Sequence, residues 1–477
     1  MTLPWPLMRP GVAVAALCGM AVTGCAHYTP KPLVPAHTAA MLESRTLSDS
    51  GLRAFIEKSL GHELPDWPLR SWNLEQLTLV AFYYSPELDV ARARWIAAGA
   101  GIVTAGARPN PSLSITPAYS TNPPAGVSPW LPSIAFDVPI ETAGKRDHRR
   151  VQAQQLSESA RWSIISTAWE VRRKLTGALL DYSVARRRES LLNRQLDLLK
   201  QIVRLEEGEF AAGAVAGSDV TVARIQLAKT RLDREATRAQ IAESHARSAG
   251  ALGIPLRALE GTELTLGIDT ADASALTSEV ARSGALQGRA DVLGALAEYE
   301  ASQAALQLEI AKQYPDVHLG PGYQWDQGQN KWLIGLTLEL PVLNRNQGPI
   351  AEAVARRTES AARLVALQAQ IIHEIDGAIS ALKTAGEASV AGETLLTAQR
   401  QNLEAAEDQL KAGAVGALEV ASARIDAVNA ESLAFEVSAR REQAVSALED
   451  AVQRPLGSEA GAQATVLQIE STQHSPR

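Results

Sequence analysis

The side chains best suited to catalysis are few and dispersed in this chain of 477 residues. His373 and Glu374 begin like a zinc-binding His-Glu-x-x-His helix, but Ile375-Asp376-Gly377 follows and no second histidine completes the motif. No Gly-x-Ser-x-Gly elbow and no phosphate-binding glycine loop is present in the sequence. We interpret His148 and His318 as groups facing solvent or a lumen rather than as metal ligands. The sequence therefore predicts no catalytic residue, no metal site and no cofactor.

Both cysteines lie near the start, at Cys18 and Cys25, which excludes a disulfide framework and a cysteine-based metal site from the rest of the chain. An apolar run, residues 11–22, follows Arg9. The run is too short to span a bilayer but has the length of the apolar region of a secretory signal peptide. We therefore expect residues 1–24 to be a signal peptide.

The apolar run ends in Val22-Thr23-Gly24-Cys25, which resembles a bacterial lipobox, where the chain is cleaved before a cysteine that is then acylated. The alternative is an accidental cysteine in an ordinary signal peptide. Ala26 stands where an aspartate would retain a lipoprotein at the inner membrane. The resemblance implies lipidation at Cys25, outer-membrane lipid as a partner, and a lipidated N-terminal segment over residues 25–72.

Composition favours long helices, since apolar residues make up 46 %, aromatic residues only 5 %, and alanine, leucine, glutamine, glutamate and arginine dominate long tracts. The net charge of −7 gives no reason to expect nucleic acid as a partner, because phosphate binding needs an excess of clustered lysine and arginine. After Cys25 no run approaches the roughly 18 apolar residues of a membrane-spanning helix. Any crossing of a membrane is therefore expected to use strands.

The sequence repeats itself at an offset of 200 residues. Ala212-Gly213-Ala214-Val215 recurs as Ala412-Gly413-Ala414-Val415, and Ala223-Arg224-Ile225 recurs as Ala423-Arg424-Ile425. Chance similarity between alanine-rich helices is the alternative, but it would not also keep prolines and a glycine turn in order. We therefore predict two tandem repeats. Their expected boundaries are residues 73–253 and 283–455, with a linker at 254–282 and a C-terminal tail at 456–477.

A coiled-coil seam runs through each repeat at alternating steps of four and three residues. Twelve of fourteen such positions from Ile164 to Phe210 are apolar, against ten of fourteen from Leu364 to Leu410. Glycines at 213–217 and 413–416 then end each long helix. We expect long antiparallel helical hairpins over residues 144–253 and 348–455. The second has the weaker seam, so its tip near Gly413 is expected to be the moving part.

Strand-like alternation precedes each helical hairpin. The expected strands cover residues 112–121 and 130–140 in the first repeat and 315–326 and 331–342 in the second. Lengths near ten residues with one apolar face fit a membrane barrel, although a small soluble sheet capping a helix bundle fits the strands as well. Four strands cannot close a barrel, so closure requires several chains; two would give eight strands and three would give twelve.

These features together resemble the TolC-like outer-membrane efflux protein family from about Leu74 to Pro455. The resemblance rests on the lipobox, on Ser85-Pro86-Glu87-Leu88 and Arg289-Ala290-Asp291-Val292 before two helices, and on Phe136-Asp137-Val138-Pro139 and Leu338-Glu339-Leu340-Pro341 between strand and helix. The stretch from Ile140 to Arg146 is similar to the heavy-metal branch. The implied fold is a mainly α homotrimer, with a twelve-stranded outer-membrane barrel continuing into a helical periplasmic tunnel.

The resemblance also implies roles for the two tips. Gly213, Ala214, Val215, Gly413, Ala414 and Val415 would dock a periplasmic adaptor protein, in a complex with an inner-membrane, proton-driven pump. Asp219 and Glu419 would lie at the tunnel mouth, where three copies of Glu419 would favour cations. The alternative is that both carboxylates only stabilise helix N-termini. Val415 and Leu410 depart from the family's basic and aromatic residues, which puts a salt-bridged lock in doubt.

The expected function is a passive conduit in the outer membrane with a large periplasmic part, which exports metal ions or other small molecules. The competing function is a lipid-anchored periplasmic coiled-coil scaffold or adaptor without a pore, which explains the heptads and Cys25 but not two strand hairpins. The sequence does not specify the cargo, the adaptor, the pump or the resting state.

Overall fold

The computed structural model describes residues 27–266 and 278–456, and the chain divides into two units, residues 1–45 and 46–477. The predicted signal peptide, Cys25 and all but the first residue of the predicted tail lie outside the described residues. In the first unit, the described part contains one helix, α2 (Pro35–Glu43), which begins with proline in its first turn, where the missing N–H costs no helical hydrogen bond. Its residues are mostly exposed.

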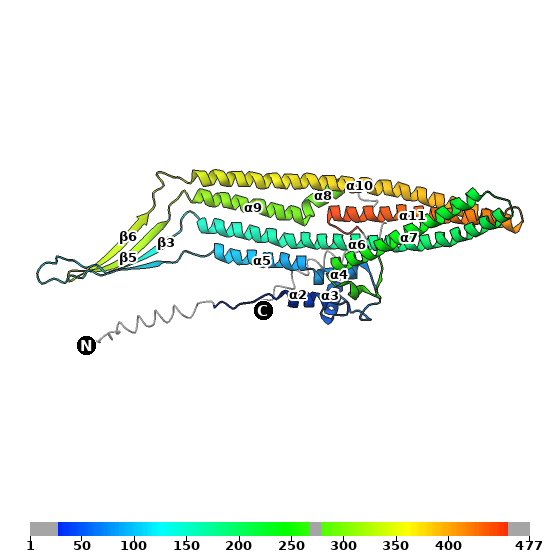
Figure 1. Ribbon diagram of the computed structural model, residues 1–477. Coiled ribbons are helices and arrows are strands. Elements are labelled where there is room, and N and C mark those ends of the chain that lie inside the picture. Colours follow the sequence, from blue (N-terminus) through cyan, green and yellow to red (C-terminus); the bar gives the residue numbers. More distant parts are fainter. Residues whose placement is uncertain (1–26, 267–277, 457–477) are drawn as a thin grey trace. The chain divides into compact units, whose positions relative to one another are not determined.

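The second unit contains two very long helices, each followed by a shorter return helix, and shorter elements around them (Figure 1). The helices are α3 (Ser50–Leu60), α4 (Leu74–Tyr84), α5 (Pro86–Ala105), α6 (Lys145–Ala211), α7 (Gly217–Leu252), η1 (Leu256–Leu259), α8 (Ser278–Gly288), α9 (Ala290–Ala311), α10 (Gln347–Lys411) and α11 (Ala417–Val452). The strands are β1 (Ser71–Trp72), β2 (Ser112–Thr116), β3 (Ser133–Ile140), β4 (Glu263–Leu264), β5 (Val317–Asp326) and β6 (Gln329–Leu338).

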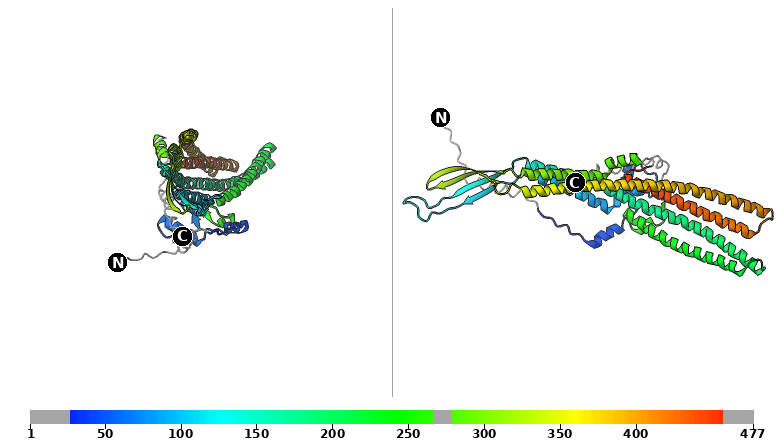
Figure 2. Two further views of the ribbon diagram at one scale, coloured as in Figure 1. Left: turned by 90° about the vertical axis from the view of Figure 1, so that its left-hand side faces the viewer. Right: turned by 90° about the horizontal axis from the view of Figure 1, so that it is seen from above.

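Helix α6 lies in the middle of this arrangement. It packs against α5 and α9 in the half next to the strands, and against α7 and α11 in the half that leads to the helical tips (Figure 1). Helix α10 packs against α9 and then α11. The long helices therefore form a layer that runs from the strands to the two hairpin tips, as the view in Figure 2 also shows.

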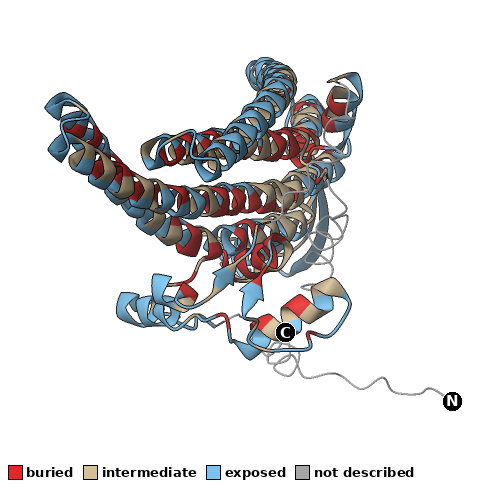
Figure 3. Cartoon of the chain, turned by 90° about the vertical axis from the view of Figure 1, so that its right-hand side faces the viewer, coloured by how far each residue is buried: buried red, intermediate tan, exposed pale blue. Residues whose placement is uncertain are grey.

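Burial differs between the two long helices. Ten of the fourteen seam positions on α6 are buried, whereas on α10 only Ile371, Ile375 and Ala378 are buried among the corresponding positions. The buried residues form stripes where helices meet, and the tips are mostly exposed (Figure 3). The apolar period of seven explains the α6 stripe, because it keeps one face of the helix against its neighbours.

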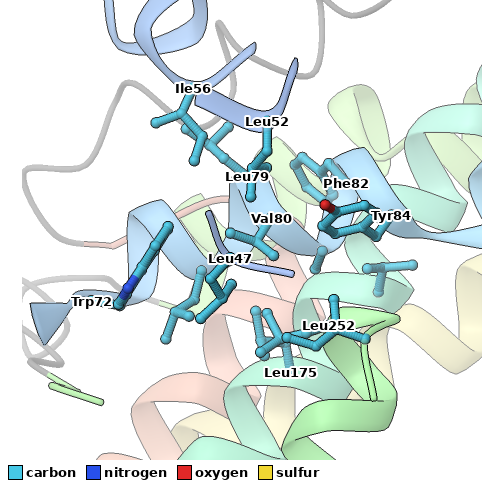
Figure 4. Packing of buried hydrophobic residues seen from close by; sticks show 14 of the residues in the cluster. Leu47, Leu52, Ile56, Trp72, Leu79, Val80, Phe82, Tyr84, Leu175 and Leu252 are labelled. Carbon is cyan, nitrogen blue, oxygen red and sulfur yellow. The ribbon is translucent and has the colours of Figure 1, made fainter. Parts of the chain in front are cut away.

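A hydrophobic cluster joins the N-terminal helices of the second unit to α6 and α7. Trp72, Phe82, Leu175 and Leu252 belong to it and are almost completely buried (Figure 4). Strand β1 pairs in parallel with β4, so the segment after α7 returns to the segment before α4. A smaller cluster packs α8 against α10 and α11.

The four longer strands form one antiparallel sheet in the order β2-β3-β5-β6. Two hairpins were expected, and the sheet adds a pairing of β3 with β5 that joins the two repeats. Strand β2 ends at Thr116 rather than at residue 121, since Pro117 follows and has no N–H to donate. Strands β5 and β6 are joined at Gln327-Gly328, both with positive φ, the turn that suits the twist of a two-residue hairpin.

Strand β6 also departs from its expected boundaries. It covers Gln329–Leu338 rather than residues 331–342. The strand stops before Pro341, which cannot donate to a ladder. Within residues 27–266 and 278–456, no helix has both the length and the apolar character that crossing a membrane requires.

Candidate functional sites: the amphipathic sheet and the helical tips

The sheet has one apolar face that extends over all four strands. Because side chains alternate along a strand and paired residues share a face, the register places these residues together. The apolar face consists of Leu113, Ile115, Ile134, Phe136, Val138, Ile140, Val317, Leu319, Pro321, Tyr323, Trp325, Trp332, Ile334, Leu336 and Leu338, with Asn330 as a polar residue next to the hairpin turn. Trp332 and Ile334 are 82 % and 84 % exposed. Contact between water and an apolar face of this extent is unfavourable, so lipid or another apolar surface must cover the face.

The opposite face of the sheet is polar and lined by small side chains. It carries serines, threonines and glycines, with Leu333 as its one large aliphatic side chain. Lys331 Nζ contacts the carboxylate of Asp326 near the hairpin turn. Further along the face, His318 Nδ1 lies 3.0 Å from both carboxylate oxygens of Asp137. One face of the sheet therefore suits lipid and the other suits water.

A set of ionic contacts joins the sheet to the start of α6. The Lys145 Nζ donates to the backbone oxygen of Tyr314 and to Asp316 Oδ1, both at 2.7 Å. The backbone N–H of Thr142 donates to the same Asp316 oxygen at 2.9 Å. Lys145 is buried, and its partner Asp316 belongs to the second repeat. A residue of the second repeat therefore fixes the orientation of the segment that connects the first strand pair to its long helix.

The two tips have the same geometry. Gly213 and Gly413 have φ of 73° and 71°, the left-handed conformation that ends a helix and favours glycine. In each tip the next N–H, of Ala214 or Ala414, donates back across the turn at 2.8 Å, to the carbonyl oxygen of Glu209 or Gln409 respectively. Val215 and Val415 are the half-buried residues of otherwise exposed turns.

Asp219 and Glu419 bind the first turns of the return helices. The carboxylate of Asp219 accepts from the backbone N–H of Ala216 at 3.2 Å, and that of Glu419 accepts from Gly416 at 3.1 Å. The residues that precede the two helices are Ala216 and Gly416. Asp219 and Glu419 therefore cap from the third helical position and reach back to the residue before the helix.

The structure brings the second tip against the first hairpin. Leu199 and Val203 of α6, Ala223 and Leu227 of α7, and Ala421 of α11 share one buried cluster. Near it, burial raises the pKa of Glu206, and the carboxylates of Asp219 and Glu209 raise that pKa further. The tips thus combine an apolar contact with a concentration of negative charge.

One pair of contacts at the tips was missed by sequence reasoning. Arg224 donates to Glu207 Oε1 through Nε at 3.1 Å, and Arg424 donates to Glu407 Oε1 through Nε at 3.1 Å. Each pair links the two arms of one hairpin. The residues of the second pair lie 200 positions after those of the first, so the sequence repeat contained the signal for these contacts. Whether two side chains meet across a hairpin, however, depends on how far each of them lies from the turn.

The described residues contain no group of three or more histidine, cysteine, aspartate or glutamate side chains that is arranged to hold a metal ion. Cys25, the one residue expected to be modified, is not among the residues described.

The fold is that of outer-membrane channels. The outer membrane protein VceC of Vibrio cholerae matches with a TM-score of 0.64 and 21 % identity, over 80 % of this chain and 97 % of VceC. The CmeC outer membrane channel of Campylobacter jejuni matches with a TM-score of 0.64 and 15 % identity, over 93 % of this chain and 98 % of CmeC. These matches confirm the predicted mainly α fold. One chain contributes a part of the sheet.

The family follows from the sequence comparison. The model of the outer membrane efflux protein family matches residues 81–253 and 281–452, so the chain belongs to this family and is an outer-membrane efflux channel protein. The cobalt-zinc-cadmium resistance protein CzcC of Cupriavidus metallidurans is 25 % identical over 331 residues, which cover 68 % of this chain and 76 % of CzcC.

Proposed function

We propose that three copies of the chain close a twelve-stranded barrel in the outer membrane and that their helices form a periplasmic tunnel beneath it. The observation that carries the proposal is the sheet itself. Its outer strands, β2 and β6, have no strand partner on one side within the described residues, while one face is apolar except for Asn330 near the hairpin turn. Unpaired strand edges are costly in lipid, and pairing β6 of one copy with β2 of the next satisfies them.

Apolar side chains on α7 support the same association. Val220, Ala223 and Leu227 of α7 are buried, whereas Ile225 and Leu232 lie on its opposite side and are 62 % and 72 % exposed. Because α7 is at one side of the helix layer, these side chains are available to a second copy. Apolar residues that no neighbour covers in one chain favour an interface between chains.

The tips are the proposed contact with other proteins of the system. In this proposal Gly213, Ala214 and Val215, together with Gly413, Ala414 and Val415, dock a periplasmic adaptor protein that links the channel to a proton-driven pump in the inner membrane. The matching geometry of the tips supports two similar docking positions per chain. The second tip is the proposed moving part, since the seam of α10 is less buried than that of α6.

Asp219 and Glu419 are proposed to contribute charge at the tunnel mouth. Each accepts one backbone N–H at the helix start, and Asp219 also accepts from Ser218 Oγ, but a carboxylate has further lone pairs beyond these contacts. Three copies of Glu419 would form a ring that favours cations. Capping and charge are therefore compatible roles.

Conductance tests the passage. The purified protein is expected to conduct ions in planar lipid bilayers, and Glu419→Ala is expected to lower the preference for cations. A purified trimer that never conducts, with or without Glu419→Ala, contradicts the channel and favours the lipid-anchored scaffold without a pore.

The lipid anchor at Cys25 is a further part of the proposal, supported by Val22-Thr23-Gly24 before the cysteine. Cells that express Cys25→Ser should yield a protein that takes up no acyl label. Unchanged labelling would refute the anchor without affecting the channel.

Divalent transition-metal ions are the proposed cargo. The support is the similarity to CzcC, which is described as a cobalt-zinc-cadmium resistance protein. Deletion of the gene should increase sensitivity to these ions more than sensitivity to detergents or antibiotics. The reverse order would assign another class of small molecule to the conduit.

A further inference from the structure

The polar face of the sheet contains one contact that the fold does not explain. Asp326 is paired with Lys331, whose ammonium group only donates hydrogen bonds. Asp137 is paired instead with His318, whose imidazole has a second ring nitrogen beyond the one in the contact. Of these two pairs, the second therefore combines a carboxylate with a side chain that can also bind a metal ion.

The geometry determines which nitrogen of His318 is free. Nδ1 lies 3.0 Å from both oxygens of Asp137. A carboxylate oxygen accepts hydrogen bonds, so Nδ1–H is the donor in this pair and Nε2 is the ring nitrogen left for another ligand. A histidine that donates one ring N–H to a carboxylate is the usual arrangement of a metal ligand, since the carboxylate orients the ring and makes its other nitrogen more basic.

The surroundings leave this nitrogen accessible. The His318 side chain is 40 % exposed and that of Asp137 is 49 % exposed. His318 lies opposite Thr337 on one side and Pro139 on the other, and Gly320 and Gly335 follow on the same face. Small side chains at these positions leave space above the ring.

We propose that His318, oriented by Asp137, is a weak binding site for divalent transition-metal ions on the polar, lumen-facing side of the barrel. Three copies place three such sites around the passage. This inference rests on the proposed trimeric channel and gives its cargo a point of contact. Imidazole nitrogen prefers Zn²⁺, Co²⁺ and related ions over Mg²⁺, which prefers oxygen. A single histidine per site keeps binding weak, as conduction requires.

The test compares conductance of the purified full-length channel in planar bilayers with Zn²⁺, with Mg²⁺ and in buffer without divalent ions. Zn²⁺ is expected to lower the monovalent conductance reversibly, with recovery on addition of a chelator, and Mg²⁺ at the same concentration is not. His318→Ala should abolish the effect of Zn²⁺. Asp137→Asn should raise the half-blocking concentration by about tenfold, the lower end of second-shell effects on metal affinity. His62→Ala, an exposed histidine outside the sheet, should behave like the unaltered protein.

The outcomes separate this inference from the proposed function. A channel that conducts but does not respond to Zn²⁺, or whose response survives His318→Ala, overturns the metal site and leaves the channel intact. A protein that fails to conduct in buffer without divalent ions contradicts the trimeric channel itself, and the site with it. Equal conductance of all variants in that buffer shows that each has folded.

Discussion

At the scale of single residues, a buried ion pair joins the two repeats. Arg172 Nη2 donates to Glu449 Oε2 at 2.9 Å, and the two side chains are 5 % and 9 % exposed. The guanidinium also lies over the ring of Trp169, 5.4 Å from its centroid. Removing one charged partner leaves the other in a medium that solvates it poorly, so each depends on the other.

Replacing one partner of this pair should destabilise the protein strongly. For Arg172→Met we expect a loss of about 3 to 5 kcal/mol in the free energy of unfolding, because Glu449 stays buried without its counter-charge. The double variant Arg172→Met/Glu449→Met should recover most of that loss. Chemical denaturation of the purified protein in detergent measures both. A double variant as unstable as the single one would show that the pair contributes by packing rather than by charge.

Asp450, next to this pair, should make stability depend on pH. Burial raises the pKa of Asp450 to about 7 from an ordinary 3.8, although Arg172 and Arg173 lower it. Between these values the folded protein binds a proton that the unfolded chain does not bind. This contribution to stability is therefore full below about pH 4 and is lost as the pH rises through about 7.

The matching variant is Asp450→Asn, which cannot titrate. The difference in unfolding free energy between the unaltered protein and Asp450→Asn should move in favour of the variant from about pH 5 to about pH 8. Comparing the two proteins at each pH removes the contributions of groups they share. A difference that stays constant over this range would contradict the raised pKa.

At the scale of elements, the tips depend on glycine for backbone conformation alone. Apart from the glycine and its two chain neighbours, no atom lies within 4 Å of the position that a Cβ would occupy at Gly213 or Gly413, yet both have positive φ. Gly208, inside α6, has equally open surroundings but ordinary helical geometry. The three positions thus separate strain in the backbone from lack of space.

Alanine at these positions should act in opposite directions. Gly213→Ala and Gly413→Ala should each destabilise the protein by about 1 to 2 kcal/mol, the cost of a left-handed conformation for a residue with a Cβ. Gly208→Ala should stabilise it by about 0.5 to 1 kcal/mol, since alanine favours a helix interior. Thermal unfolding of the three variants provides the measurement. Destabilisation by Gly208→Ala would mean that a contact with another copy constrains the site.

At the scale of the whole molecule, the association of copies should depend on the apolar side of α7. Leu232 is 72 % exposed on α7, whereas Leu433 is 52 % exposed on α11, which lies between α6 and α10. Leu232→Glu should therefore weaken the trimer by about 1.5 to 3 kcal/mol per interface, the value of burying a leucine side chain. Leu433→Glu should leave the trimer intact. Native mass spectrometry in detergent measures the trimer fraction, and equal fractions for both variants would exclude this side of α7 from the interface.

Several features could be predicted from the sequence because they depend on neighbours along the chain. The heptad pattern from Ile164 onward, the glycine at each tip and the alternation in the strands are local signals, and they led to the correct fold class and family. The duplication also indicated that the two repeats share one order of strands and helices. Strand ends were less predictable, as β2 and β6 show, because a single proline decides where pairing stops.

Only the tertiary structure determined which parts of the two repeats meet. The pairing of β3 with β5, the contact of Lys145 with Asp316 and that of Arg172 with Glu449 join residues more than 150 positions apart. The same holds for Asp137 and His318, of which the sequence indicated only that His318 faces solvent or a lumen. The type of a residue and its place in the periodic pattern indicate the face of the element on which it lies. Its contact partner depends on how whole helices and strands pack, and contacts between residues distant in sequence determine this packing.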